Sequence, residues 1–239
     1  MRFILLIAFG CLANTISAQI SLNKLKNAAI KAQEAVSPTV LSQDEVTKGL
    51  KEALIVGAKN SAENASKGGG FNNNPAIKIP FPTKSEKMKK TLVKAGFRSQ
   101  VSKFEHVLNE AAEDASSFAK EIFINAVKKM TIQDAMSILK GGDSAATMYL
   151  KTQTSKELYI KFKPVVKSSI EKVKLTKYWS SLAATYNTIL LTKEINTDLQ
   201  DYVTNQAIDG LFFLIGQEEK NIRNNPKARV SEILQKVFK

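Results

Sequence analysis

The sequence predicts an all-α fold, a helical bundle with one long central helix and a short extended, proline-containing loop segment. Three observations predict it. Apolar residues recur at three- and four-residue spacing, only six prolines occur in 239 residues, and no stretch alternates like a β-strand. A domain of roughly 200 residues buries about 70% of the surface that its unfolded chain exposes, so it needs no disulfide or metal for stability.

Residues 1–18 have the pattern of a secretory signal peptide. Arg2 gives a positive start, an apolar run follows from residue 3 to 13, and small or neutral residues lead to Ala18. The run is shorter than the roughly 20 residues of a membrane-spanning helix, and no later stretch reaches that length. We therefore expect cleavage after Ala18 and an exported chain, periplasmic or secreted. A lipid anchor on Cys11, the only cysteine, is the alternative.

Residues 19–40 are expected to form a tether or peripheral helix, and a single helical domain is expected from 41 to 239. At its start, Ser42 and Glu45 have the spacing of a capping box, which predicts a helix that begins there. The Gly-rich stretch 68–75 and the prolines after it predict a flexible loop and an extended segment. A phosphate-binding role for these glycines would need a preceding strand, whereas a helix precedes them.

The strongest periodic signal lies between Val101 and Met130, where the apolar spacing predicts one helix of about 30 residues. Thr131 can cap a short helix that ends at the pair Gly141–Gly142, and Asp143 or Ser144 can cap the next helix. Further helices are expected at residues 83–94, 158–173, 177–192, 198–216 and 230–238.

The chain is strongly basic, with a formal net charge of +13 and lysine as the main basic residue. Lysines concentrate at residues 84–98 and 151–177. One interpretation is attraction to anionic lipid or lipopolysaccharide, and the other is a solvated lysine surface. Specific phosphate recognition favours the planar fork of arginine. We therefore expect at most weak contact with anionic surfaces and no binding of nucleic acid.

Several short motifs occur in a fixed order along the chain. They are residues 49–54, 77–82, 109–115, 130–139, 141–147, 209–212 and 218–223, with Asn225, Pro226 and Arg229. Together they resemble the exported bacterial family catalogued as domain of unknown function 4197, over residues 41 to 238. The resemblance implies a helical domain located in the cell envelope, and it implies no activity.

Several polar residues are candidates for a functional site. The only histidine, His106, lies outside the motifs and is expected to be a bystander. Cleavage after Ala18 would remove Cys11, and without cysteine or a second histidine a His-rich metal site is excluded. Glu219 falls on the apolar spacing of the last long helix, so it is expected to point inward and to pair with Arg223 one turn later. The candidate polar cluster comprises Asn109, Glu113, Asp134, Asp143, Asp209, Glu219 and Arg223.

Three interpretations of this cluster remain open. The acids could be helix caps and salt bridges, or they could bind a polar or cationic ligand or a divalent ion. They could also act as acid and base in a hydrolase of envelope glycans or peptides, which needs two carboxylates about 5–10 Å apart in an open cleft.

We expect a non-catalytic exported helical module that binds an unidentified ligand or protein partner in the envelope, without a cofactor, a catalytic residue or a bound metal. A carboxylate-dependent envelope hydrolase is one alternative. A lysine-rich binder of anionic lipid or lipopolysaccharide surfaces is the other.

Overall fold

The computed structural model describes residues 42–190, 198–229 and 235–236, which belong to one compact unit. These residues form helices and no strand, so the predicted all-α fold is confirmed. The α-helices are α2 (Gln43–Ser66), α3 (Glu86–Lys94), α4 (Arg98–Ser116), α5 (Ala119–Lys129), α6 (Ile132–Lys140), α7 (Ala145–Lys172), α8 (Leu175–Leu190) and α9 (Leu199–Asn224). Two short 3-10 helices, η1 (Thr83–Ser85) and η2 (Pro226–Ala228), complete the set.

Some expectations concern residues outside the described ranges. The expected signal peptide, Cys11 and the tether at 19–40 lie outside the described residues, as does nearly all of the expected helix at 230–238. Among the helices that are described, none combines the length and the hydrophobicity needed to cross a bilayer.

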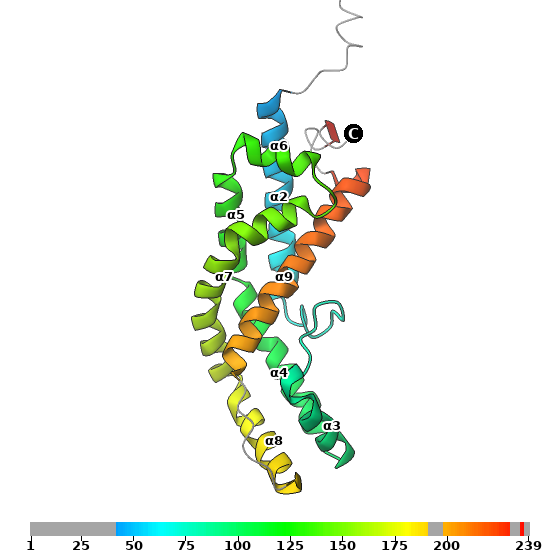
Figure 1. Cartoon of the computed structure of the whole chain (residues 1–239), viewed down its shortest axis with the longest axis vertical. Coiled ribbons are helices and arrows are strands. Elements are labelled where there is room, and N and C mark those ends of the chain that lie inside the picture. Colours follow the sequence, from blue (N-terminus) through cyan, green and yellow to red (C-terminus); the bar gives the residue numbers. More distant parts are fainter. Residues whose placement is uncertain (1–41, 191–197, 230–234, 237–239) are drawn as a thin grey trace, which may run out of the picture. The chain divides into compact units, whose positions relative to one another are not determined.

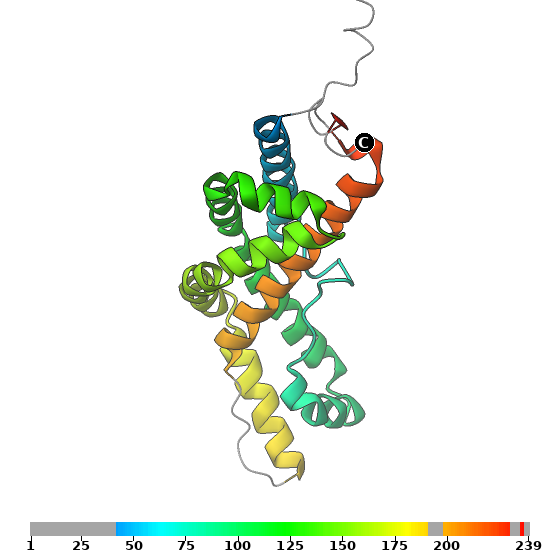
Figure 2. The ribbon, with the colours of Figure 1, turned by 45° about the horizontal axis from the view of Figure 1, so that its top comes forward.

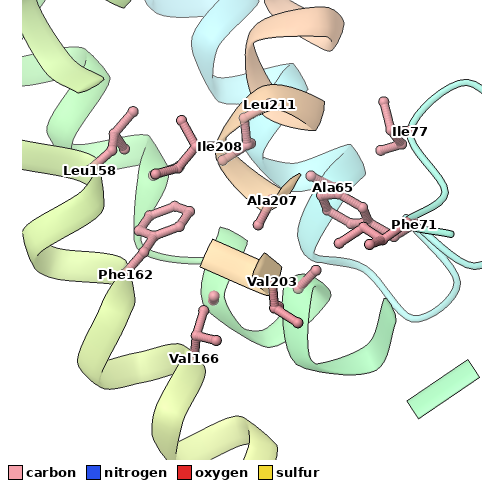
Figure 3. Packing of buried hydrophobic residues seen from close by; sticks show 14 of the residues in the cluster. Ala65, Phe71, Ile77, Leu158, Phe162, Val166, Val203, Ala207, Ile208 and Leu211 are labelled. Atoms are coloured by element: carbon pink, nitrogen blue, oxygen red, sulfur yellow. The ribbon is translucent and has the colours of Figure 1, made fainter. Parts of the chain in front are cut away.

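Helices α4 and α9 form the centre of the bundle. Helix α9 packs against α2, α4 and α7, and α4 also contacts α3, α7 and α8. Figures 1 and 2 show α5 and α6 beside α2 at one end of this bundle, and α3 and α8 at the other. The core follows from the apolar spacing of the facing helices. In Figure 3, Phe162 and Leu158 of α7 point toward Ile208 of α9, and all three side chains are buried.

The long helix expected from Val101 to Met130 is two helices, so that prediction is wrong. Helix α4 ends at Ser116, a turn follows at Ser117–Phe118, and α5 begins at Ala119. The hydroxyls of Ser116 and Ser117 donate to the carbonyls of Ala112 and Asp114, both at 2.8 Å. Such hydrogen bonds from serine to the backbone compete with the helical ladder and bend helices.

Local signals placed several helix ends correctly. Ser42 with Glu45 and Thr131 with Asp134 both form complete capping boxes. Gly96 ends α3 in a left-handed conformation (φ 93°), with hydrogen bonds from Phe97 to Leu92 and from Gly96 to Val93 that define a Schellman motif.

The structure moves three helix boundaries relative to expectation. The helix expected at 158–173 is part of α7, which begins at Ala145. The helix expected at 177–192 corresponds to α8, which begins at Leu175. The helix expected at 198–216 corresponds to α9, which extends to Asn224. Ser144 stands at the N-cap of α7, but its side chain makes no capping hydrogen bond. Instead, Glu219 of α9 accepts hydrogen bonds from the first N–H groups of α7.

Candidate functional site

Glu113 of α4 fastens the Gly-rich loop to the bundle. Its Oε1 accepts hydrogen bonds from the backbone N–H groups of Phe71 and Asn72, both at 3.0 Å, and its Oε2 accepts one from Gly69 at 3.1 Å. The N–H groups of the glycine segment thus surround an anion, which is the protein's own carboxylate. Gly69 has a φ of 80°, which suits glycine. These contacts replace the expected flexible loop with one that is held in place.

Asn109, one turn before Glu113, fastens the extended segment that follows. Its Oδ1 accepts from the N–H of Ile79 at 2.8 Å, and its Nδ2 donates to the carbonyl of Ile79 at 2.9 Å. The buried amide therefore gives Ile79 the pair of hydrogen bonds that a neighbouring β-strand would supply. The predicted extended, proline-containing segment is confirmed at this position, because residues 78–80 have no helical structure and Pro80 directly follows Ile79.

Phe71 packs against α9 through a glycine. Phe71 is fully buried, and a Cβ added to Gly210 would lie 2.7 Å from its ring. Figure 3 shows Phe71 and Ile77 from the loop side facing α9 near Ala207. Gly210 lies in the middle of a helix, where glycine costs roughly 1 kcal/mol relative to alanine, and the close approach of Phe71 accounts for it.

Glu219 of α9 caps helix α7 from a distance. Its carboxylate accepts from the N–H groups of Ala146 at 2.9 Å and Thr147 at 2.8 Å, and from the Thr147 hydroxyl at 2.7 Å. Arg223 pairs with Glu219 at 2.9 Å and donates to the Ile138 carbonyl at 3.0 Å. A carboxylate at a helix N-terminus also interacts favourably with the helix dipole. One buried ion pair therefore joins α6, α7 and α9.

The remaining residues of the predicted cluster lie elsewhere. Asp134 closes the capping box of α6, and hydrogen bonds from the Thr131 backbone and side chain hold the pKa of Asp134 below its usual value. Asp209 is exposed and lies 3.8 Å from Lys151, while Asp143 is exposed in the turn before α7.

The seven predicted residues thus do not converge on one site. Asn109 and Glu113 hold one loop, and Glu219 with Arg223 joins three helices. The described part of the chain contains no group of three His, Cys, Asp or Glu side chains placed to hold a metal ion.

A polar cleft of about 350 Å³ lies between the end of α2, the Gly-rich loop and α9. We call it the amide cleft, because asparagine and glutamine side chains make up much of its wall. Its lining residues are Ser61, Asn64, Lys67, Gly69, Gly70, Asn73, Asn74, Leu214, Gln217 and Glu218. Its volume falls within the range of about 300–1,000 Å³ that small-molecule sites occupy.

Ser61 is the unusual residue of the amide cleft. Its exposed fraction is 1%, and its hydroxyl has no hydrogen-bond partner among the described residues. The side chains of Asn73 and Gln217 make no hydrogen bond with the described residues either, whereas Lys67 donates to Asn64 at 3.1 Å. The cleft therefore presents unused donors and acceptors around a buried hydroxyl.

The amide cleft was not predicted from the sequence. Ser61 lies within the buried alanine-rich stripe Ala58, Ala62 and Ala65, and a serine at such a position is the only local signal. Asn73 and Asn74 belong to the Gly-rich stretch, for which the sequence predicts only a loop. The residues that complete the cleft come from α2 and α9, which are distant in the chain.

The fold and these contacts define an all-α domain in which buried polar side chains fasten loops to helices beside a polar cleft. The chain belongs to the family described as "Protein of unknown function (DUF4197)", whose sequence model matches residues 40–239. The predicted resemblance is thereby confirmed. Neither a curated protein nor a solved structure matches the chain.

Proposed function

We propose that this protein is a non-catalytic binding module whose amide cleft holds a small polar molecule without net charge. The observation that carries this proposal is the Ser61 hydroxyl, buried and without a partner, at a cleft of about 350 Å³. A buried polar group without a hydrogen bond costs about 1–3 kcal/mol. A ligand that bonds to Ser61 recovers this free energy, so the cost in the free protein supports a binding role.

The lining of the amide cleft indicates the ligand's chemistry. Its two charged residues, Lys67 and Glu218, have opposite sign, so the cleft favours neither anions nor cations. Asn64, Asn73 and Gln217 carry amides, each of which both donates and accepts hydrogen bonds. Sugars and short peptides, which carry many hydroxyl or amide groups and no net charge, fit this lining.

The hydrogen bonds of the buried carboxylates of Glu113 and Glu219 argue against the hydrolase. A general acid or base must exchange a proton with substrate, yet both oxygens of Glu113 and both of Glu219 accept hydrogen bonds from backbone, hydroxyl or guanidinium donors. These bonds also hold together the loops and helices around each carboxylate. The geometry therefore supports a fastening role for both residues.

Export to the cell envelope is part of the same proposal. It is supported by the apolar run at residues 3–13 and the small residues that end at Ala18. Glycan and peptide fragments are abundant polar molecules in an envelope, so N-acetylglucosamine and glycylglycine are suitable first probes.

Isothermal titration of a panel of neutral sugars, amino acids and dipeptides tests the cleft. We expect at least one probe to bind wild type, and Ser61→Ala to weaken that binding about tenfold through loss of one hydrogen bond. The control is Ser66→Ala, since the Ser66 hydroxyl bonds only weakly to Glu63 at 3.5 Å. Equal affinity of wild type and Ser61→Ala, or no binding across the panel, would contradict the proposal.

A further inference from the structure

A second hollow, of about 580 Å³, lies between α4 and α8, which pack against each other. We call it the lysine groove. Lys103 of α4 lines one side, and Lys174 and Lys177 line the other. No aspartate or glutamate lines it, and Ser99, Tyr178 and Ser181 add hydroxyl groups. The amide cleft has none of these residues, so the two hollows are separate.

In the part of the chain that the structure describes, no carboxylate pairs with the three groove lysines. Within the described residues, Lys103, Lys174 and Lys177 form no ion pair and no hydrogen bond through their side chains. By contrast, Lys163 and Lys172 of α7 pair with aspartates at 3.5 and 3.3 Å. Like charges that converge without compensation repel one another, and a bound anion removes that repulsion.

Lys174 has a backbone conformation that lysine rarely adopts. Its φ is 56°, and it is the only non-glycine residue with positive φ among those described. It stands between α7 and α8, a position where glycine would be free of strain. The chain thus places a cation beside the groove despite the conformational cost.

The surroundings of the groove reinforce its positive potential. Helix α3 packs against both α4 and α8. It carries the exposed Lys87, Lys90 and Lys94, and the exposed Arg98 opens α4. Helix α4 also lacks a side-chain cap at its N-terminus, where Ser99 lies in the first turn. Its dipole therefore adds to the attraction for an anion.

We propose that the lysine groove binds a phosphate-bearing group. Three ammonium groups match the charge of a phosphate or diphosphate, and the hydroxyls supply additional hydrogen bonds to its oxygens. The group could come from a free phosphorylated molecule or from the headgroup of a phospholipid. Both sources share this chemistry, and the test separates them.

The test has two arms, each applied to the full chain. The first is titration with pyrophosphate. The second is co-sedimentation with vesicles of phosphatidylglycerol and phosphatidylcholine in equal parts, with pure phosphatidylcholine vesicles as the blank. The test variant is K103Q/K174Q/K177Q. The matched control is K156Q/K161Q/K167Q, which removes the same charge from exposed lysines of α7.

We expect wild type to bind in at least one arm, and the groove variant to bind about 100-fold more weakly there. The control variant should stay within about threefold of wild type. Binding of pyrophosphate identifies a soluble ligand, and binding of the vesicles alone identifies a lipid headgroup. Absence of binding in both arms, or equal loss in both triple variants, would overturn the proposal. The single variants K103Q and K177Q serve if the triple variant does not fold.

Discussion

Replacement of Glu113 by glutamine tests whether one carboxylate fastens the Gly-rich loop. The glutamine oxygen can keep the hydrogen bonds from Phe71 and Asn72, but its NH₂ group would face the N–H of Gly69, where Oε2 now accepts. One hydrogen bond is thus lost, and two lose the contribution of the negative charge. Charged acceptors contribute about 1.5–3 kcal/mol per bond and neutral ones about 1, so E113Q should cost about 3 kcal/mol.

Urea unfolding followed by tryptophan fluorescence measures this loss. Trp179 is the only tryptophan, is 7% exposed, and packs against both Phe81 and Phe104, with ring centroids 5.5 and 5.3 Å away. Its fluorescence therefore reports on the packing of the segment that Asn109 and Glu113 hold. With a urea m-value of about 2–3 kcal/mol/M, the midpoint should fall by about 1 M.

The matched control is Glu110→Gln on the same helix. The Glu110 side chain is 40% exposed and contacts His106 at 3.5 Å, so its loss should change the free energy of unfolding by less than about 0.5 kcal/mol. Equal midpoints for E113Q and E110Q would refute the fastening role. Amide hydrogen exchange offers a second measurement, because exchange at Gly69, whose N–H loses its acceptor, should accelerate in E113Q and not in E110Q.

Three further substitutions test the packing of α9 and the cap of α6. Gly210→Ala should destabilise the domain by about 1–2 kcal/mol, because the new methyl group meets the Phe71 ring at 2.7 Å and this cost exceeds the gain in helix propensity. Gly216→Ala, whose Cβ would lie 3.6 Å or more from its neighbours, should instead stabilise the domain by up to about 1 kcal/mol. Asp134→Asn should make stability less dependent on pH below about pH 5, since it removes a carboxylate whose pKa Thr131 lowers.

The sign of the last effect follows from the direction of the shift. A carboxylate whose pKa is lower in the folded state than in the unfolded state stabilises the fold above its ordinary value, here 3.8. That contribution disappears as the pH falls through the folded pKa, so wild type should lose more stability on acidification than D134N does. Parallel pH profiles for the two proteins would contradict this, and a stabilised Gly210→Ala would contradict the packing of Phe71.

The sequence predicted features whose partners are close along the chain. The capping box of Ser42 and Glu45, the helix cap at Thr131 and the ion pair of Glu219 with Arg223 all follow from spacings of four residues or fewer. Such signals are local, so one window of sequence contains both partners.

Contacts between residues that are far apart in the sequence could not be predicted from local sequence patterns. Glu113 binds residues 41 to 44 positions earlier in the chain, and Glu219 binds N–H groups 72 and 73 positions earlier. The apolar period also continues through Ser117, so the break between α4 and α5 left no gap in the pattern. The amide cleft is formed by α2, the loop and α9 together, and no single segment reveals it.

Nuclear magnetic resonance of the side-chain amides tests the binding role of the amide cleft most directly. Asn73 and Gln217 have NH₂ groups without partners among the described residues, and both line the cleft. Addition of the neutral sugar, amino acid and dipeptide probes should shift the resonances of Asn73, Gln217 and the Ser61 backbone amide for at least one probe, while those of Lys103 and Lys177 stay in place. Unchanged cleft resonances with every probe would contradict the account.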